Sequence, residues 1–243
     1  MKDSDQHTFH SNDEVIYEAK HDYQKRSLAQ SYDNLRFAGI VGRVYAFLQT
    51  RAIAKMLQSL PEGSKVLDLA CGTGRITEQL LQRRFKVYAG DISQAMLDVA
   101  RERLSNYPNL VSLQKMDAEA ICAADDEFDY TVCIKLMHLV PPQVRVRMLK
   151  EISRVTRELI VLSYSCSTLY GRVRRLVKII FARRKTISQF AVTKTELEAE
   201  LGMVNLEIVK KYWTFRPLSE EIILLVKKRS RLGVSEHTQC ELH

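Results

Sequence analysis

The amino-acid sequence predicts an α/β protein with a mostly parallel sheet of seven strands and helices on both faces. Five short apolar stretches between residues 65 and 164 alternate with stretches of helical periodicity, and two more strand-like stretches follow. Strands that alternate with helices of about 10–15 residues imply a parallel sheet that is covered on both faces. A turn rich in glycine, "CGTG", joins the first apolar stretch to its helix.

The first 60 residues are expected to form a helical extension in front of this sheet. Residues 1–14 are polar and are expected to be disordered. Further along, apolar residues such as Phe37, Val41 and Val44 recur at helical spacing, which predicts two or three helices. "PEGS" at 61–64 then forms a turn.

The alternating elements come next. Ser93 is placed to cap the second of the helices between the strands. Pro142 stands in the first turn of the third, where no N–H is needed. The predicted strands span 65–70, 86–90, 110–116, 127–136 and 158–164, and the predicted helices span 74–84, 93–104 and 141–156.

The rhythm changes after the fifth strand. A basic segment comes first, expected as a helical insertion at about 169–187. Thr193 and Glu196 then form a capping box that opens a helix, and Gly202 is expected to end it. Two strands, at 206–215 and 221–228, complete the sheet. The sequence therefore predicts one domain at 61–228, preceded by the extension at 1–60 and followed by a flexible tail at 229–243.

The composition predicts a globular protein of the cytoplasm. The chain is 46% hydrophobic and 27% charged. No apolar run approaches the roughly 18 residues that span a bilayer, and the polar N-terminus lacks the apolar core of a signal peptide. The five cysteines form no C-x-x-C pair and the histidines form no ligand set. We therefore expect neither a disulfide framework nor a metal site.

The turn Gly72-Thr73-Gly74 predicts a site for a cofactor that contains a nucleoside. In a doubly wound sheet, ligands bind beyond the carboxyl ends of the strands. Glycines at that point let a ligand touch the backbone, because a Cβ would fill its space. Asp91 lies 19 residues after Gly72, at the end of the second strand, where a carboxylate can accept both hydrogens of a ribose diol.

NAD and S-adenosylmethionine (SAM) both use such a site, and two residues favour SAM. A dinucleotide site has a third glycine or an alanine where this chain has Thr77. Asp68, an acid at the end of the first strand, suits the cationic tail of SAM better than the pyrophosphate of NAD.

Four runs, "VLDLACGTGRIT", "VYAGDISQAML", "MDAEA" and "FDYTVCIKLMHLVPP", resemble the successive motifs of class I SAM-dependent methyltransferases. The resemblance is closest to the group of quinone and small-molecule methyltransferases and covers roughly residues 65–165. It implies the Rossmann-like fold of that class and SAM as the cofactor. Helices in front of the sheet usually cover the site in this class, so residues 1–60 are expected to be a lid, with Tyr32 as a neighbour of SAM.

The resemblance also implies which residues hold the tail and the ribose of SAM. Asp68 and the backbone of the turn, at Ala70, Gly72 and Gly74, would hold the amino-acid tail. Asp91 would hold the ribose. The alternative for Asp91 is an acid that gains only from the dipole at a helix N-terminus.

The adenine and the methyl group have their own implied neighbours. Ile92 and Met96 would lie beside the adenine. Asp117 would bind the adenine amino group, and the Ala118 N–H would donate to a ring nitrogen. Lys135 lies in the stretch that would pass under the methyl donor. The alternative for Asp117 is an ordinary turn residue.

His138 is the candidate for chemistry. It follows the fourth strand, where a neutral imidazole can take a proton from a hydroxyl or amine acceptor. Alignment of donor and acceptor can, however, supply most of the acceleration of a methyl transfer without a base. A hydrogen-bonding wall residue and a turn histidine are therefore the alternatives.

The net charge of +8 is concentrated in one segment. Residues 172–185 carry seven positive charges, and no Asp or Glu occurs between Glu158 and Glu196. The segment is interpreted either as a helix with solvated charges or as a surface for anionic partners, with Arg174 and Arg175 toward the substrate. Nucleic acid is disfavoured, because the Asp/Asn-Pro-Pro-Tyr run of base-amino methyltransferases is absent.

The sequence thus predicts a methyltransferase that acts on an oxygen or nitrogen of a small or lipid-like, anionic acceptor, with peripheral contact to an anionic membrane. A protein lysine methyltransferase with an acidic partner is one alternative. A SAM- or NAD-binding regulatory module without turnover is the other.

Overall fold

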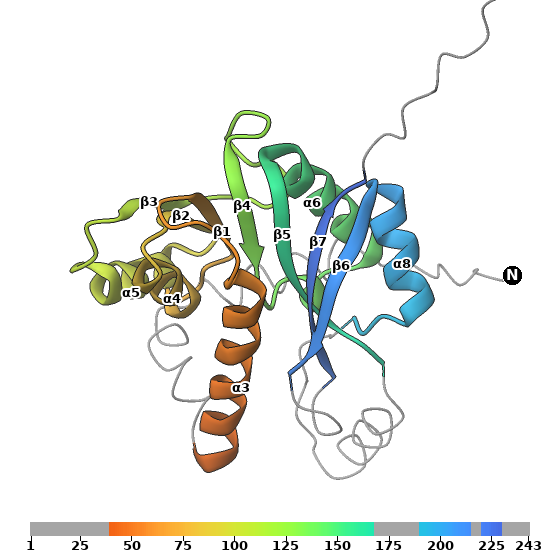
Figure 1. The fold of residues 1–243 in the computed structure, drawn as a ribbon, viewed down its shortest axis with the longest axis horizontal. Helices are drawn as coiled ribbons and strands as arrows, with labels where there is room; N and C mark the ends of the chain where they lie inside the picture. The colour runs from red at the N-terminus through yellow and green to blue at the C-terminus, as the bar shows by residue number, and fades with distance from the viewer. Residues whose placement is uncertain (1–38, 168–189, 215–219, 230–243) are drawn as a thin grey trace, which may run out of the picture.

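The computed structural model describes residues 39–167, 190–214 and 220–229 (Figure 1). In this part of the chain a single sheet has seven strands. The strands are β1 (Lys65–Leu69), β2 (Lys86–Asp91), β3 (Leu110–Lys115), β4 (Phe128–Cys133), β5 (Thr156–Ser165), β6 (Leu206–Trp213) and β7 (Glu221–Lys228). The helices are α3 (Gly39–Leu57), α4 (Arg75–Gln82), α5 (Gln94–Leu104), the 3₁₀ turn η1 (Met137–Leu139), α6 (Pro142–Val155) and α8 (Lys194–Met203).

The order of the strands places a ligand crevice between β1 and β4. The sheet runs β3-β2-β1-β4-β5-β7-β6. The chain builds outward from β1 to β3, then returns to the other side of β1 with β4 and β5, and these five strands are parallel. A reversal of this kind opens a crevice at the carboxyl ends of the strands. The predicted fold class, a mostly parallel seven-stranded sheet with helices on both faces, is confirmed.

The last strand lies inside the sheet rather than at its edge. β7 is antiparallel to both β5 and β6. Its residues from Glu221 to Val226 are all buried, whereas β6 has three consecutive exposed residues, Val209 to Lys211. The more apolar strand therefore takes the interior position. At the edge, the exposed Lys210 and Lys211 of β6 oppose pairing with another chain.

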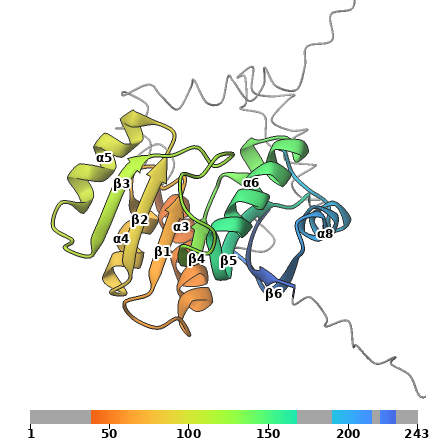
Figure 2. The same ribbon diagram turned by 90° about the horizontal axis from the view of Figure 1, so that it is seen from above.

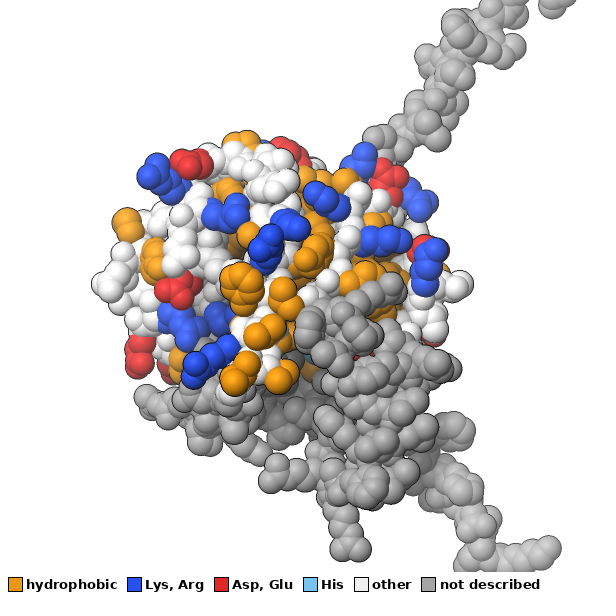
Figure 3. All heavy atoms as spheres, turned by 60° about the horizontal axis from the view of Figure 1, so that its bottom comes forward, with side chains coloured by type: hydrophobic (Ala, Val, Ile, Leu, Met, Phe, Trp, Pro, Cys, Tyr) orange, Lys and Arg blue, Asp and Glu red, His pale blue; other side chains and the backbone are white. Residues whose placement is uncertain are grey.

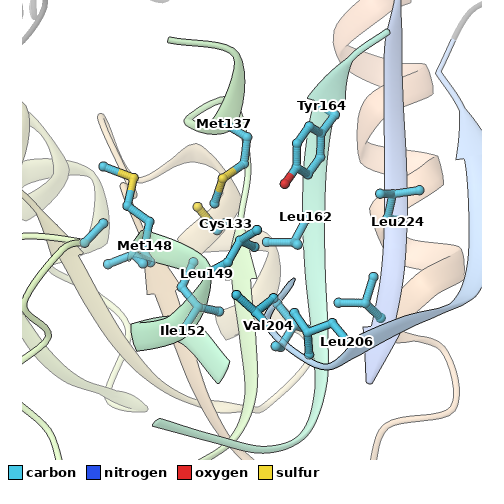
Figure 4. Close-up of a cluster of buried hydrophobic side chains, with 14 of the residues drawn as sticks. Cys133, Met137, Met148, Leu149, Ile152, Leu162, Tyr164, Val204, Leu206 and Leu224 are labelled. Atoms are coloured by element: carbon cyan, nitrogen blue, oxygen red, sulfur yellow. The ribbon is translucent and has the colours of Figure 1, made fainter. Parts of the chain in front are cut away.

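Two layers of helices cover the sheet (Figure 2). α6 and α8 pack on one face, in a core to which Leu162 and Leu224 contribute, and Figure 4 shows part of it. α3, α4 and α5 contribute to a second core together with Val161 and Ile223. Neighbours along one strand thus point to opposite cores, as the two-residue period of a strand requires.

Helix α3 is partly a core helix and partly exposed. Its second half is buried through Ala52, Ile53, Met56 and Leu57. Its first half extends past the carboxyl ends of the strands (Figure 1). The described part of the extension therefore belongs to the same core as the sheet. The lid expected from residues 1–60 stays a prediction, and residues 1–38 lie outside the described residues. No helix in the described ranges is long and apolar enough to cross a membrane.

Two local predictions are confirmed and two are wrong. The capping box of Thr193 and Glu196 is present, and the Ser93 hydroxyl accepts the Met96 N–H. Gly202 does not end α8, because the helix continues to Met203 and Asn205 (φ 56°) takes the left-handed position. The fourth strand ends at Cys133 rather than at residue 136, because the backbone turns into the left-handed region at residue 135.

A buried ion pair joins α6 to α8 and to η1. The Arg145 guanidinium donates to Glu200 at 2.5 Å, and both side chains are less than a tenth exposed. The same guanidinium donates to the carbonyls of Met137 and Val140, at 3.4 and 2.9 Å. Arg145 therefore holds both ends of the turn that contains His138.

Breaking this pair on one side is expected to destabilise the fold strongly. Arg145→Met leaves the Glu200 carboxylate buried without its cation, which should cost about 3–5 kcal/mol of unfolding free energy in urea titrations. The double variant Arg145→Met/Glu200→Met should recover most of that loss. Arg147→Met removes an exposed pair with Glu119 and should cost less than about 1 kcal/mol. An equally small loss for Arg145→Met would contradict this account.

Candidate functional site

Two residues other than glycine have a left-handed backbone conformation at the carboxyl ends of the central strands. Ala70 follows β1 with φ 60°, and Lys135 follows β4 with φ 66°. Such a conformation costs about 1–3 kcal/mol and persists only where the surrounding structure imposes it. The strained residues flank the crevice between β1 and β4, so both the topology and the backbone mark the same place.

The two glycines of the turn have different roles. Both are left-handed, with φ 56° at Gly72 and 79° at Gly74. A Cβ on Gly72 would meet no heavy atom within 4 Å, so this backbone lies beside open space. A Cβ on Gly74 would lie 3.0 Å from Leu104 and 3.2 Å from Ala100 of α5. Gly74 therefore lets α5 approach the turn, and a role of its backbone in binding the cofactor stays a prediction.

Asp91 connects the turn to the end of β2. Its Oδ2 accepts the Gly72 N–H and its Oδ1 accepts the Ser93 N–H, each at 2.8 Å. Burial raises the pKa of this carboxyl, although the backbone hydrogen bonds oppose the rise. An ionised carboxylate has about four lone-pair sites, so the bonds from Gly72 and Ser93 do not use all of them.

Asp68 is a second buried carboxyl beside the turn. It is 1% exposed, and burial, aided by the charge of Asp91, raises its pKa to about 7 against a hydrogen bond from Thr77 that lowers it. The Thr77 hydroxyl donates to its Oδ2 at 2.6 Å. Thr77 therefore replaces the third glycine of a dinucleotide turn with a hydrogen-bond donor, a role that the sequence analysis missed.

The residues predicted beside the adenine follow β2 and β3. Met96 is 3% exposed in the first turn of α5, and Ile92 is half-buried just before that helix. The Asp117 carboxylate accepts the Glu119 N–H at 3.0 Å, which is the hydrogen bond of an ordinary turn. Ala118, 7% exposed, lies next to it. Contacts of these residues with adenine stay predictions.

His138 lies in η1 and is 8% exposed. Its carbonyl accepts the Phe190 N–H at 2.8 Å, which joins η1 to the chain before α8. The histidine is thus buried in the turn that follows β4. Arg145 holds this turn through the carbonyls of Met137 and Val140. Its action as a base stays a prediction.

A polar network beyond Lys135 was not foreseen. The buried Glu221 carboxylate accepts hydrogen bonds from Tyr45, Gln49 and Thr214 at 2.6, 2.9 and 2.9 Å. The Lys135 ammonium lies 3.6 Å from the same carboxylate and donates to the Tyr45 hydroxyl at 2.7 Å. No local sequence pattern predicts this cluster, because Gln49 and Glu221 are 172 residues apart in the chain.

The network fixes the charge of Glu221. Burial alone would raise the pKa of this carboxyl, but the Lys135 ammonium and the hydrogen bonds together lower it below its usual value. Gln49 also accepts a hydrogen bond from Arg75, the first residue of α4, at 2.5 Å. The network therefore spans from the glycine turn to β7.

Three predicted residues lie outside the described residues: Tyr32, Arg174 and Arg175. The basic segment at 172–185 lies outside them as well. Within the described ranges, no group of three His, Cys, Asp or Glu side chains is arranged to hold a metal ion.

Comparison with known proteins gives the family of the central segment. Residues 66–158 match a family model described as "Methyltransferase domain". The chain is 32% identical over 145 residues to a ubiquinone/menaquinone biosynthesis C-methyltransferase of Pseudoalteromonas translucida, covering 57% of each chain. It is 35% identical over 124 residues to the magnesium-protoporphyrin O-methyltransferase of Rhodobacter capsulatus, covering 48% of this chain and 53% of that protein.

A solved structure agrees at the level of the fold. Magnesium protoporphyrin IX methyltransferase from Synechocystis, with bound SAH, superposes with a TM-score of 0.73 at 17% identity, covering 87% of this chain and 99% of that one. In sequence, this chain spans 34% to 57% of the length of the curated relatives it matches.

The raised pKa of Asp68 predicts a pH-dependent cost to stability. The pKa of Asp68 is about 7 in the folded protein and 3.8 in the unfolded chain. The contribution of this carboxyl to the free energy of unfolding is therefore fully present below the unfolded pKa and is lost as the pH rises through the folded pKa. Asp68→Asn keeps an acceptor for Thr77 and carries no charge. Its advantage in unfolding free energy over the wild type should grow between about pH 5 and pH 8, to about 4 kcal/mol.

Urea unfolding at both pH values measures that advantage. Asp98→Asn is the matched control, because the Asp98 side chain on α5 is 43% exposed. It should give no gain that grows with pH. A constant difference between Asp68→Asn and the wild type would show that the carboxyl does not titrate in this range.

Proposed function

We propose that this chain, whose residues 66–158 match a methyltransferase domain, transfers the methyl group of SAM to an oxygen or nitrogen of a small or lipid-like, anionic acceptor. The observation that carries the proposal is the pair of buried acids, Asp68 and Asp91, on either side of the open backbone at Gly72. A ligand that carries both a diol and a positive charge matches two buried carboxyls at this turn.

Asp91 is proposed to bind the ribose. Its two accepted N–H bonds fix the carboxylate in the crevice and leave acceptor sites for the two ribose hydroxyls. The Gly72 backbone beside it has no side chain in the way. The same two bonds hold the turn in place, so the free protein already has the shape of the site.

Asp68 and the turn backbone at Ala70 and Gly72 are proposed to hold the amino-acid tail. A buried carboxyl with a pKa of about 7 gains more from a neighbouring cation than an exposed one, because burial has removed its water. The ammonium and sulfonium of SAM supply such charge. Ile92, Met96, Asp117 and Ala118 are proposed to line the adenine.

The chain's part in the reaction is proposed to be alignment. SAM brings a methyl group on a sulfonium that is already activated, and a rigid site can supply most of the remaining acceleration by fixing the acceptor. His138 is proposed to contact the acceptor as a base or as a wall residue, held in either case by the carbonyl bonds of Arg145 to η1.

An apolar acceptor carried by a membrane is proposed from the surface of α3. Four of its first nine residues, Ile40, Val41, Val44 and Phe47, are 42% to 82% exposed. Figure 3 shows this face, on which hydrophobic side chains gather along α3 with Lys and Arg side chains beside them. Arg43 and Arg51 on the same helix are exposed as well. Apolar side chains flanked by cations suit an anionic membrane surface.

Calorimetric titration with SAM, SAH and NAD tests the cofactor. We expect SAM and SAH to bind and NAD to give no heat. Asp91→Ala removes a charged hydrogen-bond acceptor from the ribose and should weaken SAH binding by about tenfold or more. Asp98→Ala, on the neighbouring helix, should leave the affinity within about twofold. Binding of NAD, or an unaffected Asp91→Ala variant, would refute the proposed site.

Flotation with vesicles tests the membrane contact. Val44→Ser/Phe47→Ser should reduce binding to vesicles that contain phosphatidylserine, because the apolar insertion is lost. The control is Val111→Ser/Val209→Ser, which removes two valines that are half exposed, on β3 and β6. Equal flotation of both variants and the wild type would mean that α3 is not the contact.

A further inference from the structure

The carboxyl ends of the strands divide into two halves of different charge. β2 and β1 bring the acids Asp91 and Asp68 to one half. On the other side of the β1/β4 crevice, Lys135 follows β4, and Glu221 begins β7 next to the end of β5. The half beyond the cofactor residues therefore has an ammonium held against a carboxylate.

Lys135 is fixed in position at both of its ends. Its backbone is left-handed, and its N–H donates to the Ser163 hydroxyl of β5 at 2.7 Å. Its ammonium donates to the Tyr45 hydroxyl at 2.7 Å and lies 3.6 Å from Glu221. The side chain is 16% exposed, so it is mostly buried but part of it stays accessible.

The buried pair of Lys135 and Glu221 is not explained by a gain in the stability of the fold. A buried ion pair is often no better for stability than apolar residues of similar size, and fixing a lysine costs rotamer entropy. The left-handed backbone adds to that cost. What the arrangement does achieve is to hold the Lys135 ammonium in one place, against the Glu221 carboxylate and the Tyr45 hydroxyl.

We propose that Lys135, supported by Tyr45 and Glu221, binds the acceptor through an acidic oxygen, as in a phenol, an enol or a carboxylic acid, in its ionised form. This inference rests on the proposed function and names its acceptor class. SAM, held by Asp68 and Asp91 as proposed, would bring positive charge of its own, and positive charge favours a negative oxygen on the acceptor. The ammonium would lower the pKa of that oxygen, and its proton would leave to solvent.

The roles of the two supporting residues differ. Tyr45 accepts from the ammonium and donates to Glu221, so it orients the lysine. Glu221 supplies the counter-charge without touching the acceptor and is a positioning residue. The backbone at residue 135 can still border the cofactor, as the sequence analysis predicted, because only the side chain turns toward α3.

The test is a binding titration with 4-nitrophenol, whose absorbance reports ionisation, carried out with and without SAH over a range of pH. The wild type should bind the phenolate at least about tenfold more tightly than the phenol, which lowers the apparent pKa of the bound probe by about one unit. Lys135→Met should abolish that preference and Lys135→Arg should keep part of it. Tyr45→Phe should reduce it.

Lys55→Met is the matched control, because it removes an exposed lysine of α3 that lies over the Tyr212 ring. It should leave the phenolate preference unchanged. A wild type without preference would overturn the proposal even if no variant folded, and so would a folded Lys135→Met variant that keeps it. SAH binding distinguishes the two proposals: if SAH binds and the preference is absent, only this inference fails, whereas absent SAH binding refutes the proposed function.

Discussion

The site depends on one interaction, the hydrogen bond from the Gly72 N–H to the buried Asp91 carboxylate. This bond joins the turn after β1 to the end of β2, and the second oxygen of Asp91 holds the N–H of Ser93, the residue that caps α5. The Asp91 carbonyl also accepts the Met116 N–H from the end of β3. Three crossovers therefore meet at one residue, and the crevice has its shape before any ligand enters.

The same crevice holds charge that the fold does not favour. Burial raises the pKa of both Asp68 and Asp91, which means that ionising them in the free protein costs free energy. Thr77 and the backbone N–H groups offset only part of this cost. The cation of the proposed ligand would offset the rest, so the same two buried carboxyls that lower the stability of the protein would favour binding.

Helix α3 couples the two halves of the site. Gln49 accepts a hydrogen bond from Arg75 at the start of α4 and donates to Glu221 at the start of β7. Tyr45, one turn earlier, connects Glu221 to Lys135. The buried second half of the helix anchors it on the sheet. The polar residues Tyr45 and Gln49 therefore hold the start of α4 and the Lys135–Glu221 pair at a fixed separation.

The sequence by itself determined the features that depend on near neighbours. The capping box at Thr193 and the cap at Ser93 are bonds between residues three positions apart, so composition and spacing suffice to find them. The alternation of apolar stretches and amphipathic helices identified the parallel sheet. The 19-residue interval between Gly72 and Asp91 identified the cofactor crevice, because the length of one strand–helix unit is nearly constant.

Only the tertiary structure decided what distant residues do for one another. Gly74 accommodates α5, which follows from where Leu104 lies and not from the motif. β7, the last strand in the sequence, lies inside the sheet, because this position buries its apolar residues. Lys135 and Glu221 are ordinary charges in the sequence. They form a pair only because α3, the end of β4 and the start of β7 meet at the carboxyl ends of the parallel strands.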